Sequence, residues 1–356
     1  MVEQWPNKIE SGFWRESHVQ GIAVDRKGGY VYYSFTTMLL KTDLCGKVLG
    51  SVRNIVGHLG CITFDEDRGV LYGSLELKHD KIGEGITNRT GVRLSDRDAF
   101  YLVRFAVDRI DRMDMDAEGD DLMSAVCLHQ VERDYAAKDD HGFPHRYGCS
   151  GIDGTGYGPD FGAGRDSEKK IFVCYGVYMD LDRRDNDCQV IMKYSPDVFE
   201  RYGRPLTQTD PHREGPEEAE DTYFLYTGNT NYGVQNLEYD PWSHCWLVAV
   251  YPGKKEGFAN YPLFFVDGSM TAARGPLPGR HGEEGKLLSF APMGESEDGV
   301  IFGSRFPYGA TGICSLGDGS LYFSHPRHNK EEKSFACEVV RYRMDPNDPS
   351  VFSEEP

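Results

Sequence analysis

The sequence predicts an all-β fold, a five-bladed β-propeller whose ring is closed by the N-terminal strand. Residues 18–34, HVQGIAVDRKGGYVYYS, return with six matching positions as residues 58–74, HLGCITFDEDRGVLYGS. Each copy has a short apolar run, an Asp and a Gly four residues apart, and a second run rich in Tyr and Val, which predicts a β-hairpin. A hairpin repeat of about 40 residues has the size of a propeller blade.

Three weaker copies later in the chain give the number of blades. They lie at residues 147–178, 232–251 and 310–324, and the last contains the two-residue turn Asp318-Gly319. Because no linker separates the copies, residues 1–356 are expected to form one domain. The expected blades are residues 17–56, 57–133, 145–228, 230–293 and 300–345, with the N-terminal strand added to the last.

The outer strands are expected between these copies, and the fifth unit is one strand short. Residues 7–16, NKIESGFWRE, are predicted to supply that strand and so close the ring, which removes exposed sheet edges. Two alternatives stay open. A sixth blade could lie within residues 80–145 or 150–228, and the hairpins could form an unclosed stack.

Composition limits the partners and the compartment. A net charge of −18 makes nucleic acid and anionic membrane surfaces poor partners. No apolar run has the length of a signal peptide or of a membrane span, and the nine cysteines show no C-x-x-C spacing. We therefore expect a cytoplasmic protein with reduced cysteines in its core, and the oligomeric state stays open.

Candidate metal ligands begin the inner strands. In a propeller these strands line the central channel, so residues distant in sequence become neighbours at its mouth. Imidazole nitrogens and an amide oxygen are competent ligands, and a divalent metal is therefore possible in the channel. The candidate ligands are His18, His58, His145 and Gln235. In the alternative interpretation each histidine donates to a carbonyl of a neighbouring blade and joins the blades together.

Basic residues are expected around the same mouth, from the loops that follow the second strands or enter the inner strands. A cationic mouth on so acidic a chain would attract a small anionic saccharide. Ion pairing with nearby Asp and Glu residues is the alternative. The candidate substrate-binding residues are Gln20, Lys78, His79, Arg146, Arg183, Gln235 and Arg327.

The chemistry predicted for this mouth is β-elimination or hydrolysis of a uronate-type oligosaccharide or glycoside. His58 or His145 would be the base, Tyr308 the acid and Arg305 the partner of the substrate carboxylate. Asp153 and Glu238 remain possible acids, although the positions that open the inner strands are not carboxylates. A non-catalytic propeller that binds a sugar or a protein is the alternative function.

The segments GIAVD at 21–25, GGYVYYS at 28–34 and GDGSLYFS at 317–324 resemble the blade hairpins of NHL and SMP-30-like β-propellers. This resemblance holds at the level of single blades and implies a propeller. The metal ligands of the SMP-30 lactonases have no match here, so the resemblance does not imply that activity. The glycine-rich segment GTGYGPDFGAG at 154–164 is expected to form a flap over the channel.

Overall fold

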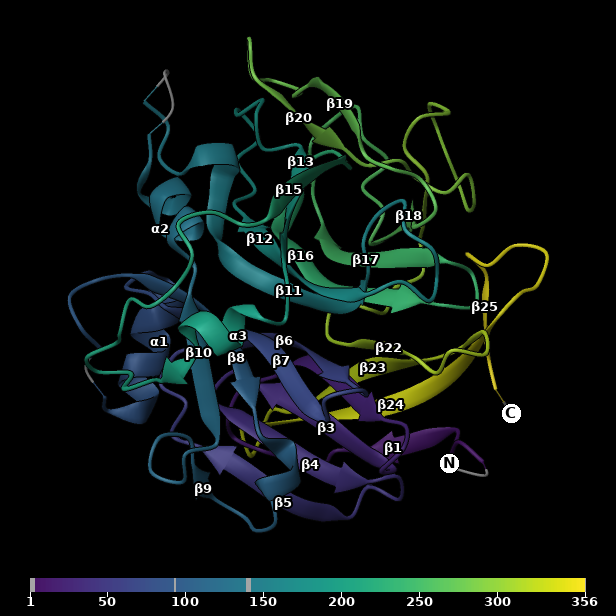
Figure 1. The fold of residues 1–356 in the computed structure, drawn as a ribbon. Coiled ribbons are helices and arrows are strands. Elements are labelled where there is room, and N and C mark those ends of the chain that lie inside the picture. The colour runs from purple at the N-terminus through teal and green to yellow at the C-terminus, as the bar shows by residue number, and fades with distance from the viewer. Residues whose placement is uncertain (1–3, 93, 139–141, 356) are drawn as a thin grey trace.

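Five β-sheets surround a central channel in the computed structural model, which describes residues 4–92, 94–138 and 142–355 (Figure 1). The innermost strands contact one another in the order β2, β6, β11, β16, β22, and β22 contacts β2. The ring is therefore closed, and the predicted five-bladed propeller is confirmed.

The strands of the first two blades follow the chain from the channel outwards. The first blade consists of β2 (Val19–Asp25), β3 (Tyr30–Phe35), β4 (Met38–Asp43), β5 (Val48–Arg53) and β9 (Met115–Asp116). The second consists of β6 (His58–Asp65), β7 (Val70–Leu77), β8 (Ala99–Phe105), β10 (Met123–Cys127) and β14 (Arg204–Pro205).

The remaining three blades are built in the same way. The third consists of β11 (Cys149–Pro159), β12 (Lys169–Val177), β13 (Cys188–Tyr194), β15 (Asp221–Tyr226), β20 (Glu284–Leu287) and β19 (Ala273–Pro276). The fourth consists of β16 (Thr230–Asp240), β17 (Cys245–Pro252), β18 (Leu263–Asp267) and β21 (Gly303–Ser304). The fifth consists of β22 (Ile313–Ser315), β23 (Ser320–Asn329), β24 (Ser334–Met344), β1 (Lys8–Glu10) and β25 (Phe352–Glu354).

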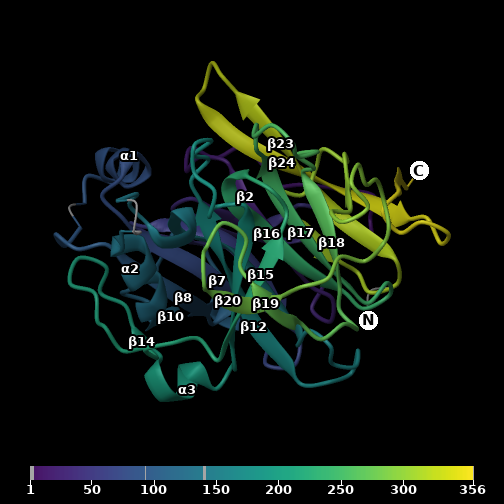
Figure 2. The same ribbon diagram turned by 90° about the horizontal axis from the view of Figure 1, so that it is seen from above.

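The helices are short and lie together on one side of the ring (Figure 2). They are α1 (Lys81–Thr90), α2 (His129–Ala136) and α3 (Val198–Tyr202), with single 3₁₀ turns η1 (Val107–Arg109) and η2 (Arg146–Gly148). Within the described ranges, none of the helices has the length and apolar character that crossing a bilayer requires.

The long second and third units contain no additional blade in their described residues. They contain α1, α2 and α3. The second unit also provides β9, which pairs in the first blade, and the third unit provides β14, which pairs in the second blade. Residues 286–293, expected to be an outer strand of the fourth blade, are shared between two blades. Lys286 and Leu287 of β20 pair with β15 of the third blade, whereas Phe290 bridges to Val266 of β18 in the fourth blade, beside which β21 also pairs. Each of these strands thus ties one blade to the blade before it.

The predicted hairpin turns form as their sequences require. The Asp25 carboxylate accepts a hydrogen bond from the Gly28 amide at 2.6 Å, and Gly29 has φ +72°. The Asp65 carboxylate accepts from the Asp67 amide at 2.9 Å, and Gly69 has φ +66°. Glycine adopts such left-handed angles at little cost, so the repeated Asp and Gly set the positions of both hairpins.

The core lies between neighbouring sheets. Successive side chains of a strand point to opposite faces, so Tyr32 packs in the cluster shared with the second blade, whereas Val31 and Tyr33 pack in the cluster shared with the fifth. Both faces of a blade are therefore buried. This explains why the strand sequences are nearly continuous apolar runs rather than an alternation of apolar and polar residues.

Ring closure depends on β1, as predicted. Ile9 pairs with Val339 of β24 and is 2% exposed, and the Tyr322 hydroxyl donates to the Pro6 carbonyl at 2.7 Å. The fifth blade consequently combines strands from the two ends of the described chain (Figure 1).

The substitution Ile9→Ala tests this closure. We expect it to lower the free energy of unfolding by about 2–4 kcal/mol, because it removes most of a buried side chain and leaves a cavity in the core. Lys8→Ala is the matched control and should change stability by less than about 0.5 kcal/mol, since Lys8 is half exposed and its ion pair with Glu354 lies at the surface. Urea unfolding measures both, and equal midpoints for the two variants would contradict closure by β1.

Candidate functional site

A polar cavity of about 560 Å³ opens at the end of the channel where the inner strands begin. The first residues of four inner strands line it together with the ends of β7, β12 and β17. The lining residues are His18, Gln20, His58, Glu76, Lys78, Ile82, Ser150, Ile152, Asp153, Gly176, Asn231, Tyr232, Gln235, Tyr251 and Pro252. The predicted convergence of His18, His58, Gln20, Lys78 and Gln235 on one mouth is therefore what the structure shows.

A buried ion pair of the second blade forms hydrogen bonds to the third blade at this mouth. Lys78 Nζ lies 2.8 Å from Glu76 Oε2 and 3.2 Å from Asp80 Oδ2, and it donates to the Ser150 carbonyl at 2.7 Å. Glu76 Oε1 accepts from the Ile152 amide at 2.6 Å. Burial by itself lowers the pKa of Lys78, but attraction to Glu76 and Asp80 outweighs it and the pKa is raised. Lys78 lines the cavity as predicted, with its ammonium group held by protein partners.

His58 stands opposite Glu76 on the neighbouring strand. Its Nδ1 lies 3.5 Å from Glu76 Oε2. Burial lowers the pKa of His58, but the contact with Glu76 and attraction to Asp153 outweigh this effect, so the pKa is raised. His58 thus contacts the carboxylate of Glu76 in its own blade. The alternative interpretation required a carbonyl of a neighbouring blade.

Asp153 is the most perturbed acid in the cavity. Its Oδ1 is buried and accepts no hydrogen bond from the described residues, while its carbonyl accepts from the Ser74 hydroxyl at 2.6 Å. Burial raises the pKa of Asp153 to about 7, with His58 lowering it and Glu76 raising it. Both protonation states of Asp153 are therefore populated near neutral pH.

His18 is shifted in the opposite direction. Burial lowers the pKa of His18 to about 4, and repulsion by His58 and Arg89 adds to the effect. Its Nδ1 lies 3.4 Å from the Ser17 hydroxyl. The imidazole is consequently neutral at neutral pH and can accept a proton.

Amides and aromatic rings complete the wall. Gln20 donates to the Thr36 hydroxyl at 3.2 Å, and Gln235 donates to the Tyr232 carbonyl at 3.1 Å. The rings of Tyr232 and Tyr251 meet edge to face at 6.5 Å, and Tyr232 is 44% exposed at the rim. Amide groups and exposed aromatic faces are suited to sugar hydroxyls and sugar rings.

Three residues of the predicted catalytic set do not line this cavity. His145 packs between Tyr135 and Tyr178, and its Nδ1 faces the Tyr135 carbonyl. Tyr308 stacks on His325 with ring centroids 3.6 Å apart. Arg305 pairs with two glutamates on the surface, Glu295 and Glu297. Of the predicted catalytic residues only His58 lies in the cavity, because the side chains of the other three are held by the contacts given above.

The predicted cationic mouth is largely neutralised by ion pairs. Two of the partners, Glu283 for Arg146 and Glu10 for Arg327, come from distant parts of the sequence, so local charge patterns could not show these pairs. His79 pairs with Asp98 at 3.0 Å, Arg146 with Glu283 at 2.9 Å, Arg183 with Asp185 at 2.6 Å, and Arg327 with Glu10 at 3.2 Å and with Glu338 at 3.0 Å. These four residues do not line the cavity, which favours the ion-pair interpretation.

Possible metal ligands gather closely at a different place. Within the part of the chain that the structure describes, the group of His, Cys, Asp or Glu side chains with ligating atoms within 4.8 Å of one another is Cys127, His129 and Glu132. It lies beside α2, outside the channel cavity. Arg213 and Arg97 contact Glu132 at 2.7 and 3.4 Å, and this positive charge disfavours a cation there.

Sequence reasoning missed Glu76 as a lining residue. Glu76 lies near the end of β7, the second strand of its blade. The available signal was this position, since side chains at the ends of second strands border the same mouth as the starts of inner strands. Tyr251 lies near the end of β17 in the same way, and Tyr232 has φ +66° in a bulge of β16 that sets the direction of its side chain.

Fold and site together define a five-bladed β-propeller with a polar, partly aromatic cavity at one channel mouth. Neither a protein-family model nor a curated protein matches the chain. Among solved structures, a functionally unknown protein from Desulfotomaculum acetoxidans is similar at 11% identity and TM-score 0.36, over 100% of this chain and 77% of that one. The PQQ domain of pyranose dehydrogenase from Coprinopsis cinerea is similar at 11% identity and TM-score 0.39, over 90% and 81%. These similarities concern the fold, and a shared fold does not imply a shared function.

Proposed function

We propose that this protein is a carbohydrate-active enzyme that cleaves a small saccharide in the cavity at the start of the inner strands. The single observation that carries the proposal is Asp153, a buried carboxylic acid among the residues that line the cavity, close to His58 and Gln235. Its pKa of about 7 suits a general acid that works near neutral pH.

The two groups with opposite pKa shifts define the roles. Asp153 donates a proton to the leaving glycosidic oxygen, and neutral His18 accepts a proton from the attacking water as its oxygen bonds to the anomeric carbon. A base with a pKa of about 4 has the proton affinity of the second carboxylate in an inverting glycosidase. His18 would thus act as the base in place of a second carboxylate, since the positions that open the inner strands are not carboxylates.

For a uronate substrate, His58 would take the role predicted for Arg305, that of the partner of the substrate carboxylate. The raised pKa of His58 increases its positively charged fraction, and that charge can pair with a sugar carboxylate. In that case His18 would remove the proton beside the carboxylate and Asp153 would protonate the leaving oxygen, which is β-elimination. Anionic saccharides are therefore the first substrates to examine.

The metal predicted for the channel stays a prediction. His18, His58 and Gln235 line the cavity, whereas His145 does not, and the lining carboxylate of Asp153 could replace it as a ligand. Element analysis of the purified protein tests this. A cytoplasmic location is also kept as a proposal, with which nine free cysteines, eight of them buried, agree.

A sugar-binding propeller without catalysis is the second candidate. The exposed ring of Tyr232 and the amides of Gln20 and Gln235 favour it, because stacking and hydroxyl recognition need no titrating group. The two candidates make different predictions for turnover.

A turnover screen over neutral and uronate oligosaccharides tests the proposal. We expect either new reducing ends or the ultraviolet absorbance of an unsaturated uronate, with a rate that falls as pH rises through about 7, where Asp153 loses the proton it must donate. Binding of these sugars without product would establish the non-catalytic candidate instead.

A further inference from the structure

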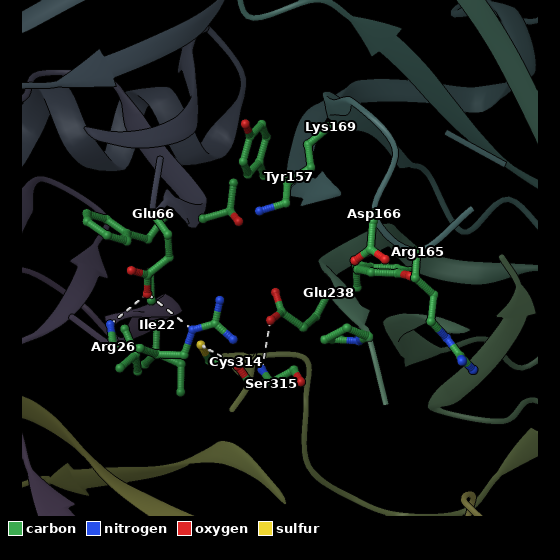
Figure 3. Close-up of a pocket in the computed structure, with 16 residues that line it drawn as sticks. Ile22, Arg26, Glu66, Tyr157, Arg165, Asp166, Lys169, Glu238, Cys314 and Ser315 are labelled. Atoms are coloured by element: carbon green, nitrogen blue, oxygen red, sulfur yellow. Dashed lines mark hydrogen bonds and ion pairs between the residues drawn. The ribbon is translucent and has the colours of Figure 1, made fainter. Parts of the chain in front are cut away.

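A second cavity lies at the opposite end of the channel. Its volume is about 260 Å³, and the later residues of the inner strands line it (Figure 3). On β2 the first cavity takes Gln20 whereas the second takes Ile22 and Val24, and on β16 the first takes Gln235 whereas the second takes Glu238. The same strands thus present different chemistry at the two ends.

Side chains in the middle of the channel lie between the two cavities. The Asn236 amide donates to the Gln20 carbonyl at 2.8 Å and to the Ala310 carbonyl at 3.1 Å. The Cys61 thiol lies 3.2 Å from Asn236 Oδ1 and 3.3 Å from the Thr155 carbonyl. The two cavities share no lining residue, so the second is a separate candidate site.

Glu238 extends into the second cavity from β16. One carboxylate oxygen accepts from the Ser315 amide at 2.7 Å, and the carboxyl group faces the guanidinium of Arg26 across open space (Figure 3). Burial raises the pKa of Glu238 to about 8, whereas the Ser315 amide and Arg26 lower it and Asp240 raises it. At neutral pH this carboxyl group is mostly protonated and is a hydrogen-bond donor.

Arg26 is positioned by Glu66 from the neighbouring blade. Glu66 Oε1 accepts from the Arg26 amide at 2.7 Å and from Nε at 3.1 Å. This contact fixes the side chain so that the end of the guanidinium points into the cavity toward Glu238 (Figure 3). A guanidinium held in one orientation is the preferred group for planar oxyanions.

A second cation comes from β12. Lys169 extends its ammonium group toward the cavity (Figure 3), and its partner Asp67 is an exposed residue 3.4 Å away. The β11–β12 connection also brings Asp166 and Arg165 to the wall, and the Arg165 side chain points away from the cavity (Figure 3). The prediction of a flap for the glycine-rich segment is wrong for residues 154–159, which belong to the inner strand β11, and Tyr157 of this segment lines the second cavity.

We propose that this second cavity is a binding site for a small oxyanion, a phosphate or a carboxylate, held between Arg26 and Lys169 with Glu238 as a hydrogen-bond donor. Its small volume excludes most of a sugar chain but admits one anionic group. Two cations and a protonated acid converge there. The carboxylates of Glu66 and Asp166 also line the cavity, and Glu66 binds Arg26 through one of its oxygens. The site is independent of the function proposed for the other mouth.

Binding at this site depends on the proton of Glu238. A bound anion that accepts a hydrogen bond from the Glu238 carboxyl group favours the protonated form of Glu238. Deprotonation would place the Glu238 carboxylate beside the bound anion, and the two negative charges would repel each other. The titratable or charged groups that interact with Glu238 are Arg26, Asp240, Cys61 and Cys314, and Glu66, Asp166 and Lys169 line the same cavity. Affinity should therefore fall as pH rises through about 8.

Calorimetric titration of the purified protein with inorganic phosphate, and separately with acetate, tests the proposal. We expect one of the two to bind at about pH 6.5, and Arg26→Gln and Lys169→Gln each to weaken binding about tenfold. Lys170→Gln is the matched control and should leave affinity unchanged, because Lys170 pairs with Glu168 at 3.2 Å and does not line the cavity.

Glu238→Gln gives a readout that a misfolded variant cannot imitate. Glutamine keeps a neutral donor at this position, so this variant should bind at about pH 6.5 and retain its affinity at about pH 9, where the unmodified protein loses it. The proposal is overturned if neither anion binds, or if binding is the same in all four variants. Saccharide turnover plays no part in the measurement, so failure of this site and failure of the proposed enzyme are distinguishable.

Discussion

Asp153→Asn is expected to lower saccharide turnover by about 10²- to 10⁴-fold, the usual contribution of general acid catalysis. Asparagine keeps the size and polarity of the side chain but cannot give up a proton to the leaving oxygen. Because a neutral amide replaces an acid that burial keeps partly protonated, the fold should tolerate the change. Steady-state kinetics should show the loss in kcat, with KM changed much less.

The control for this variant is Asp197→Asn, which makes the same change at an exposed position next to α3. It should leave both kinetic parameters unchanged. In Asp153→Asn, the residual rate should also lose its decline through about pH 7, because the titrating group is gone. Full turnover by Asp153→Asn with the pH profile intact would assign the acid to another residue.

Lys78→Met is expected to destabilise the protein by about 3–5 kcal/mol, because it leaves the buried carboxylate of Glu76 without its cation. The contact to the Ser150 carbonyl is lost as well, which weakens the junction of the second and third blades. Urea unfolding measures the effect. The double variant Lys78→Met, Glu76→Gln should recover part of the loss, since the unpaired charge is then absent.

The matched control for Lys78→Met is Lys81→Met, an exposed residue at the start of α1, which should change the free energy of unfolding by less than about 0.5 kcal/mol. If Lys78→Met were as stable as this control, water would have to reach Glu76 through the cavity. The description of Glu76 and Lys78 as a buried ion pair would then be wrong.

The blade hairpins could be predicted because their signals are local. Asp25 and Gly29 lie within one turn, as do Asp65 and Gly69, and each pair acts on its own backbone. The fourth hairpin shows the limit of this rule. Asp240 accepts from the Ser243 amide at 2.7 Å, and His244 with φ +62° stands where the other turns have glycine.

The sequence by itself determined the all-β class, the five hairpin starts and the closing strand, because repeat spacing and turn chemistry act over a few residues. Only the tertiary structure decided which side chains meet. A register shift between Ile152 and Thr155 of β11 adds residues at Asp153, and His145 and Tyr147 have positive φ angles in the turn before β11. Ion pairs between residues distant in sequence, such as Arg146 and Glu283, likewise decided which charged side chains are available to a ligand. Such contacts form only when the ring closes, so neighbouring residues in the sequence do not indicate them.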